Sequence, residues 1–112
     1  MASEVIVYTR PGCPFCMSLR SGLRRRELSF TEVDIWREAE AAAVVRSIAD
    51  GNETVPTVVV DHDSERRWQA VNPSAAEVLD AVAEHAPELV PAQRPGPVRG
   101  ALDALGLRKK EN

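Results

Sequence analysis

Apolar and polar residues recur with two different periods along this chain, and these periods predict seven elements of secondary structure. Runs rich in β-branched residues and bounded by Gly, Pro or charged residues indicate strands. Four such runs occupy residues 4–9, 29–35, 57–61 and 66–71. The polar residues 62–65 separate the last two runs, which is the pattern of a β-hairpin.

Apolar residues at helical spacing lie between and after these runs. Pro14 suits the first position of a helix, and apolar residues follow it at i, i+3 and i+7 as one stripe: Cys16, Leu19 and Leu23. A second amphipathic helix is predicted over residues 37–50, before a Gly-Asn pair. A third follows Ser74, which has the spacing of a capping box with Glu77, and ends before Pro87.

The order of these elements, β-α-β-α-β-β-α, predicts an α/β fold. A right-handed crossover makes the first two strands parallel and the hairpin adds antiparallel strands, so we expect a small four-stranded mixed sheet with helices on both faces. This domain should occupy residues 1–86. In residues 87–112, four of the eight prolines fall close together, which predicts a Pro-rich, flexible tail.

Composition narrows the class of protein. The chain has 112 residues, a formal net charge of -3 and 44% hydrophobic residues, as expected of one ordinary domain. It has no run of ~18 uncharged apolar residues, and Glu4 stands where a signal peptide would carry positive charge, so we expect a cytoplasmic protein with no membrane partner. The absence of a concentrated basic face argues against binding to nucleic acid.

The two cysteines, Cys13 and Cys16, lie where a predicted strand meets a predicted helix. A thiolate at the start of a helix faces unpaired N–H groups and the positive end of the helix dipole, which lower its pKa. We therefore expect Cys13 to be a nucleophile. Cys16 lies one turn deeper on the apolar stripe, close enough to form a disulfide with Cys13, and suits the role of the resolving thiol.

Other interpretations of the cysteine pair remain. The two thiols could be inert core residues. A structural zinc site needs a second pair of ligands, which this chain lacks, because His62 and His85 lie far apart and are expected to be solvated surface residues. An iron-sulfur cluster shared between two subunits would satisfy the ligand count and stays open.

Two motifs resemble the glutaredoxin family. The segment of residues 8–16, YTRPGCPFC, is similar to the glutaredoxin active-site segment, and Thr54-Val55-Pro56 is similar to the family's T-V-P segment. The resemblance covers residues 4–86 and implies a thioredoxin-like fold and thiol-disulfide oxidoreductase activity. It also implies a cis Pro56, which would let the backbone of Val55 meet an incoming thiol.

Within this family the chain resembles the actinobacterial mycoredoxins. Residues 51–58, GNETVPTV, are similar to a mycoredoxin block, and Asn72-Pro73 stands where glutathione-using relatives have a Gly-Gly pair. This departure favours mycothiol over glutathione as the small thiol. The Pro14-Phe15 pair departs in the other direction, toward the C-P-Y-C motif of dithiol glutaredoxins.

The resemblance also suggests which residues bind substrate and what the partners are. The candidate binding residues are Arg10, Phe15, Thr54, Val55, Pro56, Asn72 and Ser74, with Arg37 as a weaker candidate. Trp36 and Trp68 are expected to be half-buried packing residues. We expect a monomer that uses no metal or organic prosthetic group and acts on small thiols and disulfide-containing proteins. The rival functions are a dedicated electron donor to a protein such as ribonucleotide reductase and a dimeric iron-sulfur scaffold.

Overall fold

The computed structural model describes residues 2–91, and its elements follow the predicted order. The strands are β1 (Ser3–Thr9), β2 (Thr31–Asp34), β3 (Thr57–His62) and β4 (Glu65–Val71). The helices are α1 (Pro14–Arg25), α2 (Ala39–Ile48) and α3 (Ala75–His85), followed by the short 3-10 helix η1 (Pro87–Leu89). Among residues 2–91, no helix is long and apolar enough to cross a membrane.

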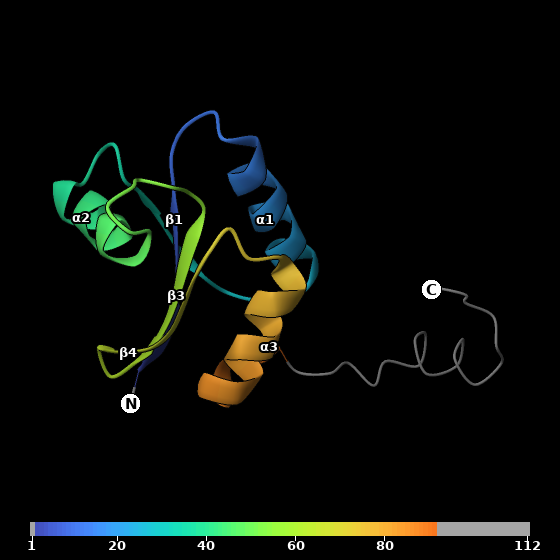
Figure 1. Cartoon of the computed structure of the whole chain (residues 1–112). Coiled ribbons are helices and arrows are strands. Elements are labelled where there is room, and N and C mark those ends of the chain that lie inside the picture. Colours follow the sequence, from blue (N-terminus) through green and yellow to red (C-terminus); the bar gives the residue numbers. More distant parts are fainter. Residues whose placement is uncertain (1, 92–112) are drawn as a thin grey trace, which may run out of the picture.

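The four strands form one mixed sheet in the order β2-β1-β3-β4. β1 and β2 run parallel, whereas β3 is antiparallel to both β1 and β4. Figure 1 shows α2 on one face of this sheet and α1 with α3 on the other. The predicted mixed sheet with helices on both faces is confirmed.

Side chains along the two central strands, β1 and β3, point alternately to the two faces of the sheet, and this divides the core into two clusters. Val5 and Val7 of β1 lie with Val58 and Val60 of β3 in the cluster formed with α1 and α3. The residues that alternate with them point to the opposite face, so Tyr8 and Val59 belong to the cluster formed with α2. Both cysteines, Cys13 and Cys16, are part of this second cluster, which therefore reaches from α2 to the start of α1.

Several boundaries differ from the predicted ones. β2 begins at Thr31 and ends at Asp34, so Ile35 is buried beyond the strand. α2 begins at Ala39 rather than at residue 37. In the hairpin the loop shortens to two residues, Asp63 and Ser64, whose φ angles of 54° and 66° are those of a tight primed turn. The hydrophobic pattern locates elements, but local hydrogen bonding sets their ends.

Ordered structure continues past residue 86. Leu89 of η1 packs against the cluster of α1 and α3, and the carboxylate of Glu88 accepts a hydrogen bond from the hydroxyl of Ser3 in β1. These contacts attach η1 to the body of the domain. The predicted domain limit at residue 86 and the flexible tail stay predictions, since residues 92–112 lie outside the described part of the chain.

Candidate functional site

Cys13 is the residue on which helix α1 begins. A short loop, in which Gly12 takes a φ of 73°, leads from β1 to Cys13, and Pro14 occupies the first turn of the helix. The sulfur of Cys13 is the N-terminal cap, because it accepts a hydrogen bond from the backbone N–H of Cys16 at 3.2 Å. The helix start therefore places a hydrogen-bond donor on the sulfur, as the sequence predicts.

Both thiols are nearly covered, with exposed fractions of 3% for Cys13 and 1% for Cys16, and both are free. Burial is the largest single influence on the pKa of Cys13 and raises it, but hydrogen bonds from the thiol and N–H of Cys16, the charge of Arg10 and the N–H of Phe15 together lower it. The net pKa of Cys13 lies below that of an ordinary thiol. Burial, followed by the hydrogen bond to Cys13, raises the pKa of Cys16 to about 12.

The two thiols are therefore electrostatically unequal. Cys13 loses its proton more readily than an ordinary thiol, whereas Cys16 keeps its proton and donates it in a hydrogen bond to its neighbour. The sequence indicated the helix start as a stabiliser of the Cys13 thiolate. It missed both the donor thiol of Cys16 and the opposing effect of burial, because these depend on side-chain positions and not on spacing.

Two segments that are distant in the sequence meet beside Cys13. The carbonyl of Val55 lies 3.9 Å from the Cys13 sulfur, and the Val55–Pro56 peptide bond is cis, as the resemblance implied. The backbone N–H of Asn72 donates to the carbonyl of Pro56 at 2.7 Å. Candidate residues of the T-V-P segment and of the turn before α3 are thus brought to one place. Thr54 is exposed beside them.

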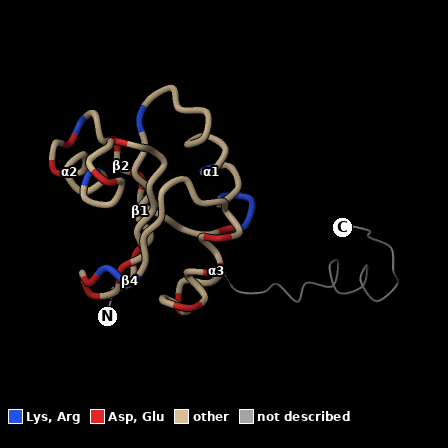
Figure 2. Tube along the Cα trace, in the orientation of Figure 1, with Lys and Arg blue, Asp and Glu red and all other residues tan. Residues whose placement is uncertain are grey.

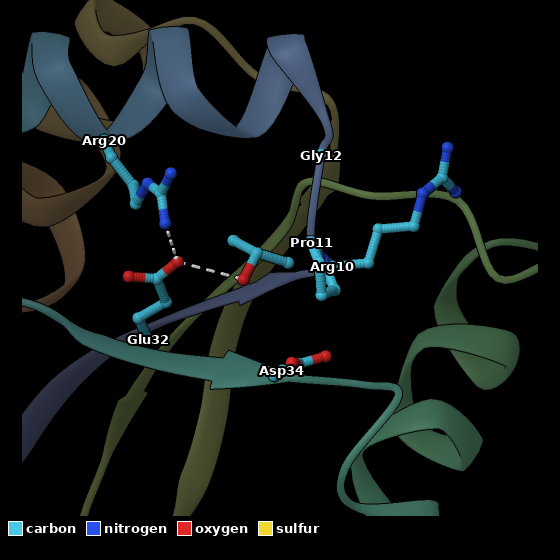
Figure 3. Close-up of a pocket in the computed structure, with 7 residues that line it drawn as sticks. Arg10, Pro11, Gly12, Arg20, Glu32 and Asp34 are labelled. Atoms are coloured by element: carbon cyan, nitrogen blue, oxygen red, sulfur yellow. Dashed lines mark hydrogen bonds and ion pairs between the residues drawn. The ribbon is translucent and has the colours of Figure 1, made fainter.

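A pocket of about 330 Å³ adjoins the loop before Cys13 and is shown in Figure 3. In it Glu32 of β2 accepts hydrogen bonds from Arg20 of α1 at 2.5 Å and from the buried hydroxyl of Thr9 at 3.0 Å. These contacts join α1 and β2 to the last residue of β1. The side chain of Arg10 points away from Glu32 and toward solvent in Figure 3, so Arg10 influences Cys13 by its charge alone.

The sequence did not single out Glu32, Arg20 or Thr9. A polar residue inside an apolar strand was the signal available, since a buried hydroxyl requires a partner. The identity of that partner depends on how β2 lies beside β1, which spacing does not reveal.

The remaining candidate binding residues lie in different surroundings. Phe15 is 64% exposed beside Cys13, and Ser74 forms the predicted capping box with Glu77. Arg37 is an exposed residue whose guanidinium lies 3.7 Å from the carboxylate of Asp34. None of these contacts assigns a ligand, so the binding roles stay predictions.

Two expectations about packing fail and one holds. Trp36 is 66% exposed and not half-buried; it lies beyond the end of β2, where its backbone N–H donates to the carboxylate of Asp34. Trp68 does pack against the core, as predicted. His62 is not simply solvated, since its ring bonds to the hydroxyl of Ser3 at 2.7 Å. Within residues 2–91, no three or more His, Cys, Asp or Glu side chains gather as a metal site would require.

Comparison with known proteins shows what the chain resembles. The family model of glutaredoxins matches residues 5–64. The chain is 40% identical over 77 residues to Mycoredoxin 1 of Corynebacterium glutamicum, a match that spans 69% of this chain and 90% of that protein. It is 36% identical over 78 residues to a putative glutaredoxin of Mycobacterium tuberculosis, spanning 70% of this chain and 88% of the relative.

Solved structures agree on the architecture. The glutaredoxin-like protein NrdH-redoxin of Escherichia coli is similar with a TM-score of 0.55 and 22% identity, covering 80% of this chain and 99% of that one. The thioredoxin-like protein BC3987 has a TM-score of 0.56 and 23% identity, covering 70% of this chain and 94% of that chain. These similarities establish the thioredoxin-like fold.

Proposed function

Because this chain belongs to the glutaredoxin family and is a thiol-disulfide oxidoreductase, we propose that Cys13 is its nucleophile and Cys16 its resolving thiol. The observation that carries this assignment is the difference between the two pKa values. The pKa of Cys13 lies below the ordinary range, and that of Cys16 is about 12. Near neutral pH, Cys13 is the thiol that attacks, because the thiolate is the reactive form.

In the first step, the Cys13 thiolate attacks one sulfur of a substrate disulfide. A new S–S bond forms between Cys13 and that sulfur, the substrate S–S bond breaks, and the departing thiolate takes a proton from water. In the second step, the thiolate of Cys16 attacks the Cys13 sulfur, releases the remaining substrate thiolate and leaves the Cys13–Cys16 disulfide, so the substrate gains two electrons from the enzyme. Where Cys13 instead holds the sulfur of a small thiol, the thiolate of a second small thiol attacks that sulfur, forms a disulfide with it and releases the Cys13 thiolate, so the enzyme ends as a dithiol.

The proton of Cys16 is released more easily after the first step. In the free enzyme, the donated hydrogen bond and the neighbouring Cys13 charge both raise the pKa of Cys16. Once the Cys13 sulfur is part of a mixed disulfide, it carries no charge and accepts a weaker hydrogen bond. Both influences diminish while burial, the largest cause of the raised pKa, remains, so the pKa of Cys16 falls toward the ordinary thiol range in this step.

The similarity to Mycoredoxin 1 supports mycothiol as the small thiol. The absence of a Gly-Gly pair before α3, where Asn72 and Pro73 stand, supports the same choice over glutathione. We expect the thiol to approach Val55 and Pro56 and to contact Arg10, Phe15, Thr54, Asn72 and Ser74. Such a reaction requires a reducing compartment and therefore a cytoplasmic site of action.

Cys13→Ser and Cys16→Ser variants test this assignment against a mixed disulfide of mycothiol. We expect Cys13→Ser to be inactive and Cys16→Ser to keep activity, because a mixed disulfide needs the nucleophile alone. Wild-type protein supplied with glutathione or with thioredoxin reductase as the electron source is the matched comparison. Equal loss of activity in both variants would replace this mechanism by a strictly dithiol one, and faster reduction by thioredoxin reductase would favour a dedicated protein electron donor.

A further inference from the structure

A groove of about 510 Å³ starts beside the candidate nucleophile and follows helix α1. One wall is formed by α1 residues at helical spacing and by the residue that caps the helix, Arg26; the α1 residues are Phe15, Ser18, Leu19, Gly22 and Arg25. The other wall is formed by residues 72–77, which comprise the turn before α3 and the first turn of that helix. The groove therefore leads from the thiol end of α1 to its basic end.

The near end of the groove belongs to the redox site. The backbone N–H of Phe15 is one of the donors that lower the pKa of Cys13, and the Phe15 ring is 64% exposed. A buried Gly22 forms part of the floor, where a Cβ would lie 2.9 Å from the Cβ of Ala75. The two helices thus approach so closely that the groove is shallow, and Ser18 at its middle is exposed.

The far end of the groove carries positive charge. Arg25 donates to the hydroxyl of Ser21, and Arg26 to the carbonyl of Gly22, so neither is paired with a carboxylate within residues 2–91. Figure 2 shows the basic residues gathered where α1 ends. The lining residue Glu77 is acidic, but its carboxylate accepts the Ser74 N–H at 2.7 Å. The groove is locally positive in a chain whose net charge is -3.

We propose that this groove binds an acidic segment of the polypeptide that carries the substrate disulfide. The proposal rests on the proposed function, since it requires Cys13 to attack a protein disulfide. Phe15 would contact the residues next to the substrate cysteine, and Arg25 and Arg26 would bind carboxylates further along the chain. The N–H groups of Ser74 and Glu77 at the start of α3 take no part, because the capping box already occupies them.

Helix geometry sets the spacing of the acidic residues. Phe15 and Arg25 are ten residues apart in one helix, which corresponds to about 15 Å along its axis. An extended peptide covers that length in about five residues. The best substrates therefore carry Glu or Asp about five residues from the disulfide cysteine, on the side of the cysteine that runs along α1.

Fully reduced protein tests this in single-turnover reactions, which need no external reductant because Cys13 and Cys16 supply both electrons. The probes are peptides whose single cysteine is joined to a small thiol. A Glu pair is placed about five residues before or after the cysteine, and Gln and Lys pairs serve as controls. At low salt we expect one Glu peptide to react about three- to tenfold faster than its Gln counterpart, and the advantage to shrink as salt screens it.

Variants of groove residues test whether the groove causes the preference for Glu peptides. Arg25→Gln with Arg26→Gln should remove the preference for Glu, whereas Arg24→Gln should keep it, because Arg24 lies over the ring of Phe30 instead. Ser18→Tyr should slow every peptide by filling the groove, which keeps the test valid if the double variant folds poorly. Reduction of a mixed disulfide without a peptide should keep its wild-type rate in all of these variants, and a wild-type protein that fails to reduce it would count against the proposed function, not the groove.

Equal rates for Glu and Gln peptides in both orientations would overturn the proposal. A preference that persists in the double arginine variant would also overturn it. If the double variant instead slows the small mixed disulfide alone, the groove binds the small thiol and not a polypeptide.

Discussion

Replacing Cys16 by Ala should raise the pKa of Cys13 more than replacing Arg10 by Ala. The Cys16 thiol donates a hydrogen bond to the Cys13 sulfur, in addition to its backbone N–H at 3.2 Å. Arg10 acts on the same sulfur through an exposed charge that points toward solvent. A buried hydrogen bond is weakened little by solvent and salt, whereas a charge at the surface is screened by both.

The magnitude follows from the strength of such contacts. A hydrogen bond to a charged group contributes about 1.5–3 kcal/mol, and a thiol is a weak donor, so we take the lower end. Because 1.36 kcal/mol corresponds to one pKa unit, Cys16→Ala should raise the pKa of Cys13 by about 1. Arg10→Ala should raise it by less than ~1, and high salt should shift the wild-type protein by no more than that.

Ultraviolet absorbance of the thiolate, measured against pH, reports the titration directly. The pKa of Cys16 is about 12, so the wild-type curve below that range reflects Cys13. Cys16→Ser is the matched control, because a hydroxyl at the same position can still donate and should keep the pKa of Cys13 low. An unchanged pKa in Cys16→Ala, together with an ordinary thiol value in Arg10→Ala, would show that the arginine charge is the main stabiliser.

Three more predictions concern the packing of Gly22, the packing of Leu89 and the titration of Cys13. Gly22→Val should lower the free energy of unfolding in urea by about 1–3 kcal/mol through overpacking against Ala75, while Ser21→Ala at the exposed neighbouring position should change it by less than ~0.5 kcal/mol. A chain ending at residue 86 should melt several degrees below one ending at residue 91, because it lacks the packing of Leu89, and equal melting temperatures would contradict that contact. In reduced protein, the free energy of unfolding of the wild type relative to that of Cys13→Ala should rise with pH, starting at the lowered pKa of Cys13 in the folded state and ending at the ordinary thiol value of ~8.5. Between these two pH values the unfolded chain keeps the thiol proton and the folded chain does not, so raising the pH favours the folded state. A difference that stays constant with pH would contradict the lowered pKa.

The strand and helix positions could be predicted because each depends on local sequence. The β-branched runs of β1 and β3 and the capping box at Ser74 are interactions within a few residues, and the structure has them where the pattern placed them. Trp36 shows the limit of such reasoning. Its neighbour Ile35 is buried and Trp36 is not. The chain leaves the sheet after Asp34, so the alternation of inward and outward side chains along β2 no longer predicts which of the two is buried.

The contacts made across the fold could not be predicted. Glu32 receives donors from both β1 and α1, and the turn at Asn72 bonds to Pro56 of a distant loop. Neither contact can be recognised from the spacing of its residues in the sequence, since each depends on which strands and loops become neighbours in the fold. The groove along α1 likewise requires that α3 begins against Gly22.

One turn of helix accounts for the unequal thiols. The spacing of three residues lets the N–H and thiol of Cys16 both donate to Cys13, while the same turn carries Cys16 into the core, where burial raises its pKa. Moving the second cysteine by one position would turn its side chain off the apolar stripe and away from the first sulfur. The C-x-x-C spacing is therefore a condition for making one thiol acidic and keeping the other protonated, and the proposed order in which the two thiols react rests on this difference.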